Sequence, residues 1–495
     1  MFLFTNHLAA LKTILKFKHM KNFLLFVFSV TIFSCGENKK SSSENNMVKL
    51  ITLDPGHFHA ALVQKLMYEG VDSTVHVYAP AGPDVELHLD RIKAYNSRTE
   101  NPVHWKEEVY TGSDFFEKML QENKAGPNDS VHRDVVIIAG NNRKKTEYIF
   151  KSVEAGLNVL ADKPMAIDKK NFELLKSAFS EAKKNNVLLY DIMTERYEIT
   201  TILQRELSLI PGIFGQQEKG TSASPGITKE SIHYFYKYVS GSVLTRPPWF
   251  MDVTQEGEGI TDVTTHLVDL VQWECFPEQV IDYQKDITLT SARHWPTEIT
   301  LSQFNTLTQL NGFPDYLKKD IVNDSVLKVF SNGEINYELR GIHAKISVEW
   351  NYKAAEGAGD SHYSMMRGTK ANLIIKQGSE QNYQASLYIE PARRTGKPTD
   401  KNDFPDSAFL TDQMKSIIAK YPGVGLKRNA AGWEVIIPDK YKEGHEAHFA
   451  RVTEKFLQFL KEGKIPEWEI AGMIAKYYTT TSALELANKS QKKKR

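Results

Sequence analysis

A lysine at the end of an apolar run is the first residue whose type and position indicate chemistry. Lys163 follows Val159–Asp162 and precedes Pro164, which favours a buried strand that ends in a turn. Ligands bind at the carboxyl ends of strands in parallel sheets, and burial there is expected to lower the pKa of a lysine. Lys163 would then exchange a proton with a hydroxyl group. Spacing alone also fits a surface lysine before a turn proline.

A second segment places a histidine between two carboxylates. In a helix over 262–273, Asp262, His266 and Asp269 would lie on one face. The two carboxylates are then expected to raise the pKa of His266 and to orient its ring. The alternative is a histidine on a helix surface with salt-bridge partners.

The first predicted strand-to-helix turn has the sequence Asp54-Pro55-Gly56-His57-Phe58-His59. A dinucleotide site requires Gly-x-Gly-x-x-Gly at this position, because the glycines let the backbone approach a pyrophosphate. Only Gly56 fits this pattern, since Asp54 and His59 replace the outer glycines. An ordinary Pro-Gly turn is the alternative. No acidic residue ends the second strand, at Tyr78, so the sequence does not distinguish NAD from NADP.

The histidines predict no metal site. His57 and His59 are two residues apart, with no evident third ligand. His445 and His448 are three apart, whereas the zinc motif His-Glu-x-x-His has them four apart.

Apolar runs separated by helical patterns predict a parallel sheet in the first part of the chain. The expected strands cover 48–53, 75–78, 134–139, 157–161 and 187–191, and the expected helices cover 58–69, 143–155 and 169–185. Asp168 is suited to cap the last of these helices, and Thr194 the helix after it. Alternating strands and helices imply β-α-β crossovers. We therefore predict an α/β Rossmann domain, with a doubly wound parallel sheet, at residues 47–195.

The pattern changes after about residue 210, where the chain becomes rich in short strands. Residues 212–230 are expected to form a loop. The expected strands then cover 232–239, 326–330, 334–338, 343–350, 371–376 and 383–390, and two helices cover 444–461 and 468–487. Apolar and polar residues alternate over 343–350, as in a sheet with one face in water. We predict an α+β domain at residues 196–495.

The first 46 residues have the features of an export signal. A cationic start precedes the apolar run Phe23–Phe33, which is too short to span a bilayer but has the length of a signal-peptide core. Ile32–Cys35 resembles a bacterial lipobox, and a polar tether follows it. We expect an exported lipoprotein, periplasmic or at the cell surface, anchored to a membrane by a lipid on Cys35. The alternative is a cleaved signal in which Cys35 has no role.

Charge and cysteine content exclude other classes. The formal net charge of +1 gives no basic excess for binding nucleic acid. With Cys35 in the signal, Cys275 has no partner for a disulfide.

The motifs together resemble those of the Gfo/Idh/MocA oxidoreductase family. Asp162-Lys163-Pro164 is similar to the family's Glu-Lys-Pro motif, and Asp262–His266 is similar to its Asp-x-Gly-x-His pattern. Ala139–Asn142 resembles the family's Thr-Pro-Asn turn over the cofactor. The resemblance covers about 47–488 and implies a Rossmann domain followed by an α+β domain with a large, open, mostly antiparallel sheet. Asp162, Thr264 and the altered glycine pattern depart from the family's motifs.

The resemblance also implies roles for individual residues. Lys163 and His266 would transfer protons, and Asp262 would bind substrate hydroxyls or orient His266. A tightly bound NAD or NADP would contact a set of residues around the first turn and the Lys163 motif. These are Gly56, His57, Phe58, His59, Asn141, Asp162, Lys163 and Pro164. Arg196, Trp249 and Asp269 would bind substrate.

The implied substrate is a sugar, a cyclitol or a derivative of one, oxidised at a carbinol carbon. The family also includes glycoside hydrolases that recycle NAD, and an exported protein without a free cofactor pool fits that alternative. A third possibility is a non-catalytic carbohydrate-binding lipoprotein, which the Asp54 and His59 departures favour. Relatives of this kind often pair through their open sheets, so a homo-oligomer is expected.

Overall fold

The computed structural model describes residues 47–124, 133–239, 242–392 and 405–492. The predicted signal, with Cys35, lies outside these residues. Within the described ranges, none of the helices combines the length and the apolarity needed to cross a membrane.

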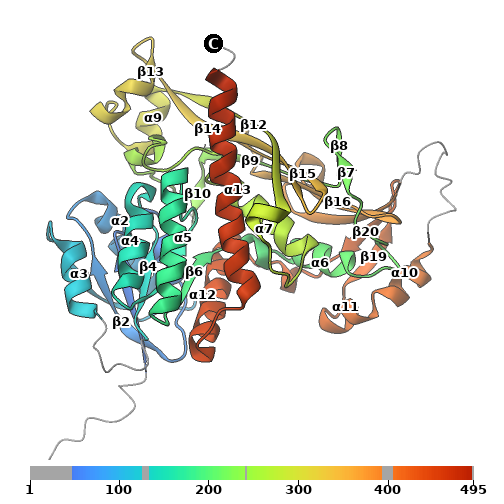
Figure 1. The fold of residues 1–495 in the computed structure, drawn as a ribbon, viewed down its shortest axis with the longest axis horizontal. Coiled ribbons are helices and arrows are strands. Elements are labelled where there is room, and N and C mark those ends of the chain that lie inside the picture. The colour runs from blue at the N-terminus through green and yellow to red at the C-terminus, as the bar shows by residue number, and fades with distance from the viewer. Residues whose placement is uncertain (1–46, 125–132, 240–241, 393–404, 493–495) are drawn as a thin grey trace, which may run out of the picture. The chain divides into compact units, whose positions relative to one another are not determined.

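The first sheet has six parallel strands in the order β3-β2-β1-β4-β5-β6 (Figure 1). The strands are β1 (Val48–Leu53), β2 (Val71–Tyr78), β3 (Lys106–Tyr110), β4 (Val135–Ile138), β5 (Asn158–Asp162) and β6 (Leu189–Ile192). The helices are α1 (His59–Val63), α2 (Pro83–Ser97), α3 (Phe115–Asn123), α4 (Asn142–Glu154) and α5 (Lys169–Lys184). The predicted Rossmann-like sheet is therefore confirmed.

Burial and capping explain the central elements of this sheet. Every residue of β4, β5 and β6 is buried, as expected for strands covered by helices on both faces. The Asp168 carboxylate accepts a hydrogen bond from the Asn171 N–H, so the predicted cap of α5 is confirmed. The predicted Thr194 cap is wrong, because α6 (Ile199–Ser208) begins later and Glu198 caps it.

The first helix is shorter than predicted. It ends at Val63 rather than near residue 69. The Tyr68 hydroxyl donates to the Val63 carbonyl at 2.6 Å, and the Trp105 indole N–H donates to the Gln64 carbonyl at 2.7 Å. Side chains from elsewhere thus satisfy carbonyls that another helical turn would have used.

The second sheet is large and mostly antiparallel, as predicted. Its order is β12-β14-β15-β9-β16-β17-β18-β20-β19, with β13 paired to β14, and only β9 and β15 run parallel. The strands are β9 (Ile227–Tyr236), β12 (Ile287–Thr300), β13 (Ile321–Val322), β14 (Val326–Leu339), β15 (Ile342–Lys353), β16 (Ser361–Arg367), β17 (Ala371–Gln377), β18 (Ser386–Pro391), β19 (Gly425–Arg428) and β20 (Trp433–Ile436). Two hairpins, β7 (Gly220–Thr221) with β8 (Ser224–Pro225) and β10 (Tyr238–Val239) with β11 (Ser242–Val243), lie outside it.

One face of this sheet is covered and the other is polar. On β15, Ala344, Ile346 and Val348 are buried, while Lys345 and Ser347 alternate with them. The buried face packs against α7 (Thr264–Cys275). Shorter helices complete this half of the chain: α8 (Tyr283–Asp286), α9 (Leu301–Thr308), α10 (Ser407–Gln413) and α11 (Lys415–Lys420).

The last two helices return to the first sheet. They are α12 (His445–Glu462) and α13 (Glu467–Lys492). Figure 1 shows α13 as a long helix that runs between the two sheets. Its Met473 and Tyr477 belong to the core of the first sheet, whereas Ala475 and Ala483 belong to that of the second. Because α13 is apolar on two sides, it joins both cores.

Candidate active site

Two backbone positions bring the turn after β1 across the end of β4. Asp54 has a left-handed backbone with a φ of 49°. A Cβ on Gly140 would lie 1.9 Å from the Asp54 carbonyl oxygen, so any side chain there would push the two loops apart. The His57 N–H donates to the Ala139 carbonyl at 3.1 Å. Backbone contacts therefore fix the position of the His57–His59 turn.

An indole ring covers Gly56, the one glycine that fits the dinucleotide pattern. A Cβ at this position would lie 2.9 Å from Cζ2 of Trp249 and 3.0 Å from Oδ2 of Asp84. The Trp249 indole N–H donates to that Asp84 oxygen at 2.7 Å. Trp249, which we predicted to line the substrate pocket, thus contacts the turn predicted to bind the cofactor.

The segment that follows Trp249 is tied to the loop after β4. The Asn141 side chain caps α4 by accepting from the Arg143 N–H, and its amide donates to Gln255 at 2.7 Å. The amide of Asn142 donates to the backbone carbonyl of Glu256 at 2.6 Å. Two neighbouring asparagines therefore hold the large-sheet part of the chain against the switch point of the parallel sheet.

Two histidines gather around Asp162, the last residue of β5. Nδ1 of His59 lies 2.9 Å from Oδ2 of Asp162, and Nδ1 of His57 lies 3.7 Å from it. The Phe58 ring packs beside both imidazoles, with ring centroids 4.6 Å and 4.4 Å away. Burial lowers the pKa of both histidines well below the usual range, so both are neutral at pH 7.

Lys163 is paired with Asp262 across 99 residues of sequence. The Lys163–Pro164 peptide bond is cis, and both residues are buried. Burial alone would lower the pKa of Lys163, but Asp262 and then Asp162 raise it, and the net shift is upward. The predicted decrease of this pKa is therefore wrong, because a carboxylate meets the ammonium group at the end of the strand. Lys163 stays charged at neutral pH.

The environment of His266 also differs from the prediction. Helix α7 begins at Thr264, so Asp262 precedes it, and Asp269 pairs with Arg196 instead. Nδ1 of His266 is buried and has no hydrogen-bond partner among the described residues. Burial, and then the charge of Lys163, lower the pKa of His266 to about 4. The predicted increase is wrong because both carboxylates are engaged elsewhere.

Arg196 and Asp269, predicted to bind substrate, belong to a buried ionic network. Nε of Arg196 donates to Asp269 at 2.6 Å, and its Nη1 donates to Glu469 at 2.8 Å. Nζ of Lys476 lies 2.9 Å from Asp269 and 2.6 Å from Asp191. The network joins β6, α7 and α13. Sequence spacing gave no signal for Glu469 or Lys476, which are more than 200 residues from their partners.

Two further carboxyl groups near the site were not predicted. Burial, and then Asp262, raise the pKa of Glu256 well above the usual range, which favours its protonated form. Burial would also raise the pKa of Glu195, but His445, at 3.3 Å, lowers it, and the net shift is downward. The two pKa values are therefore shifted in opposite directions: Glu256 interacts with Asp262, and Glu195 interacts with His266.

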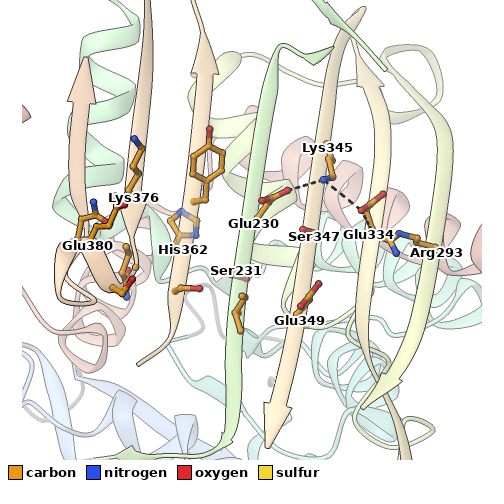
Figure 2. Close-up of a pocket in the computed structure, with 17 residues that line it drawn as sticks. Glu230, Ser231, Arg293, Glu334, Lys345, Ser347, Glu349, His362, Lys376 and Glu380 are labelled. Atoms are coloured by element: carbon orange, nitrogen blue, oxygen red, sulfur yellow. Dashed lines mark hydrogen bonds and ion pairs between the residues drawn. The ribbon is translucent and has the colours of Figure 1, made fainter. Parts of the chain in front are cut away.

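The open face of the large sheet carries a separate hollow of about 490 Å³ (Figure 2). Lys345 lies in its lining, 2.9 Å from Glu230 and 3.8 Å from Glu334. Charged groups in this hollow thus already pair with one another across the strands. Lys163, Asp262 and His266 are not among the residues that line this hollow. We place the candidate active site at Lys163, where titratable groups are buried and have perturbed pKa values.

The fold is that of a class of proteins in which a Rossmann-like sheet is followed by a large open sheet. Residues 92–191 match the family described as "Oxidoreductase family, NAD-binding Rossmann fold". Residues 203–488 match the family described as "Putative oxidoreductase C terminal domain". The chain belongs to the Gfo/Idh/MocA oxidoreductase family.

Solved structures agree with this assignment. The chain is similar to a "putative oxidoreductase" from Parabacteroides merdae, with 55% identity and a TM-score of 0.84 over 90% of this chain and 98% of that one. An oxidoreductase domain protein from Kribbella flavida shares the fold, with 15% identity and a TM-score of 0.54 over 89% and 98% of the two chains. So does levoglucosan dehydrogenase, solved with NADH and levoglucosan, with 12% identity and a TM-score of 0.52 over 89% and 97%. Comparison with curated proteins gives no match.

The residues around Lys163 and Asn141 fit the nicotinamide half of a bound dinucleotide. Lys163 comes directly after β5 and Asn141 ends the loop after β4, at the edge of the sheet where a nicotinamide would bind in this fold. At Gly56 the missing Cβ leaves room for a close approach, but the indole of Trp249 takes that room. The side of Gly56 on which a Cβ would point is therefore closed by Trp249.

Proposed function

We propose that the protein is an NAD(P)-dependent oxidoreductase that acts on a carbinol group of a sugar, a cyclitol or a derivative of one. The observation that carries the proposal is the buried Lys163–Asp262 pair at the carboxyl end of β5, close enough to His266 for the charge of Lys163 to lower the pKa of that histidine. Membership of an oxidoreductase family and the shared fold of a sugar dehydrogenase support the same activity.

The protonation states suggest a division of labour between Lys163 and His266. The charged Lys163 would donate a hydrogen bond to the substrate oxygen and stabilise negative charge there. The neutral His266 has a buried Nδ1 without a partner, and it would accept the hydroxyl proton during oxidation. When bound, the nicotinamide supplies the hydride acceptor for the carbinol carbon. In the reverse reaction, the protonated His266 would return the proton to the carbonyl oxygen while Lys163 keeps its hydrogen bond to that oxygen.

Lys163→Ala tests this role. Sugars, anhydrosugars and cyclitols are first screened with NAD⁺ and NADP⁺ for the appearance of reduced cofactor. Lys163→Ala should then lower kcat by roughly 10²–10⁴-fold and leave NADH affinity unchanged within a few-fold. Lys176→Ala, on the surface of α5, is the matched control. Turnover at the wild-type rate in Lys163→Ala would rule out the assignment.

A recycled cofactor is the second candidate function. The contacts from Asn141 and Asn142 to the segment after Trp249 favour it, because they would enclose a cofactor once it had bound. A hydrolase of this kind would cleave a glycoside with no net change in NADH. Quantifying released sugar and reduced cofactor in one reaction distinguishes it from a net dehydrogenase.

We also propose that the protein is exported and carries a lipid on Cys35. The apolar run before Cys35 and the polar tether after it support this proposal. Labelled fatty acid should be incorporated into the wild type in a bacterial host and not into Cys35→Ser. Equal labelling of both proteins would contradict lipidation at this residue.

A further inference from the structure

We propose that His57, His59 and Asp162 form a binding site for a divalent transition-metal ion, with Zn²⁺ as the reference ion. One ligand atom from each residue lies within 4.8 Å of the other two. The two imidazole Nδ1 atoms lie 2.9 Å and 3.7 Å from Oδ2 of Asp162. Ligand atoms of a tetrahedral zinc ion with bonds of about 2.0–2.2 Å are roughly 3.3–3.5 Å apart. The observed separations lie on either side of this range.

The fold holds these ligands in place before any ion binds. The histidines follow β1, the aspartate ends β5, and both strands flank β4 in the sheet. Gly140, at the end of β4, has no side chain to keep the turn after β1 away. The His57 N–H is fixed to the Ala139 carbonyl. Backbone geometry therefore brings the three ligands together, so binding of the ion would require little further ordering of these side chains.

The carboxyl group of Asp162 is buried and only partly satisfied by its neighbours. Its Oδ2 contacts Nδ1 of His59 at 2.9 Å. Asp162 is only 2 % exposed. Its Oδ1 has no hydrogen-bond partner among the described residues. A buried carboxylate oxygen without a partner is costly, and coordination would satisfy it.

The lysines that border the cluster already have partners. Nζ of Lys145 donates to the Asp162 carbonyl at 3.1 Å, and Lys163 is paired with Asp262. Their positive charges will weaken cation binding, but neither ammonium group is paired with the Asp162 carboxylate. Two imidazoles and one carboxylate leave at least one coordination position open for water or a substrate hydroxyl. This inference goes beyond the proposed function, since binding of the ion needs neither NAD nor substrate.

Titration of the full-length protein after chelation tests the site. Isothermal titration with Zn²⁺ should give one equivalent bound per chain, and Co²⁺ should give the visible absorption bands of a site with nitrogen ligands. His59→Ala and Asp162→Asn should each weaken Zn²⁺ binding by at least 10-fold, within the range known for altered metal sites. His104→Ala is the matched control, because His104 is exposed and distant in sequence from the cluster.

A thermal-unfolding measurement tests the proposal on the wild type as well, so the test does not depend on every variant folding. Zn²⁺ should raise the unfolding temperature of the wild type, and this increase should vanish in Asp162→Asn, which keeps the shape of the side chain. Binding of less than about a tenth of an equivalent by the wild type would overturn the proposal. So would Zn²⁺ affinity that is equal in the wild type and in the double variant His57→Ala/His59→Ala. A failure here would leave the Lys163 experiments unaffected.

Discussion

The indole of Trp249 lies against Gly56, with Cζ2 2.9 Å from the position that a Cβ on residue 56 would take. Asp84 holds the ring there by accepting from its N–H at 2.7 Å. In this fold the backbone of that turn is where a pyrophosphate approaches. We therefore expect a dinucleotide that approaches this turn on the side of Trp249 to displace the indole.

Trp249→Ala should speed the association of NADH. The alanine removes the ring from Gly56, so the turn is open before the ligand arrives, and the observed association rate should rise several-fold. Stopped-flow NADH fluorescence measures this rate. Trp249→Phe is the matched control, because it keeps a ring but loses the hydrogen bond to Asp84, and it should give an intermediate rate. Slower association in Trp249→Ala would mean that the indole helps to hold the cofactor.

Asp262→Asn should destabilise the protein and shift the titration of Lys163. The variant leaves the buried Lys163 ammonium without its carboxylate, which costs about 3–5 kcal/mol. Burial lowers the pKa of Lys163 and nearby carboxylates raise it. Without Asp262, fewer carboxylates oppose the effect of burial, so the pKa of Lys163 should fall. Urea unfolding at pH 7 measures the stability, and the rate of amine acylation against pH reports the lysine. Glu230→Gln, which breaks a half-exposed pair with Lys345, should cost less than about 1 kcal/mol.

Asp54→Asn should stabilise the protein at pH 8 and have little effect at pH 3. Burial, and then Asp84, raise the pKa of Asp54 to about 6 from 3.8. A carboxyl group with a raised pKa binds its proton more tightly in the folded state. Its contribution to stability is present below pH 3.8 and is lost as the pH rises through about 6. Asparagine carries no charge to lose and tolerates the left-handed backbone at this position.

The expected gain from Asp54→Asn at pH 8 is on the order of 3 kcal/mol, because the pKa of Asp54 is raised from 3.8 to about 6 and one pKa unit corresponds to about 1.4 kcal/mol. Denaturant unfolding at both pH values measures it. Asp90→Asn, at an exposed position of α2, is the control and should show no such difference between the two pH values. An equal effect of Asp54→Asn at pH 3 and pH 8 would contradict the assigned pKa.

Sequence patterns predicted the first sheet because its central strands are apolar along their whole length, and the second because apolar and polar residues alternate along a strand such as β15. The run Val135–Ile138 has no other stable environment than the interior of a parallel sheet. By contrast, β12 escaped prediction because it is polar and contains Pro296. It lies at the edge of its sheet, and the proline falls in a register shift between Trp295 and Thr297, where a ladder hydrogen bond is dispensable.

The candidate site was predictable in its residue types and not in its pairings. The strand-end position of Lys163 follows from a local pattern, so it could be found. Its partner Asp262 and the pair of Asp162 with His59 depend on contacts across about a hundred residues. The directions of the pKa shifts failed for the same reason: burial and long-range charges set them, and neither is visible in local spacing.

Arg196→Met tests whether Arg196 is a substrate ligand or part of the framework. Both carboxylates that Arg196 binds are buried, so the variant leaves Asp269 and Glu469 without one of their cations. We expect a loss of about 3–5 kcal/mol in the free energy of unfolding. KM in the fraction that remains folded should change little, since the guanidinium is already engaged by protein groups. Arg143→Met, at an exposed position of α4, is the control for losing an arginine. A large increase in KM with unchanged stability would instead make Arg196 a substrate ligand.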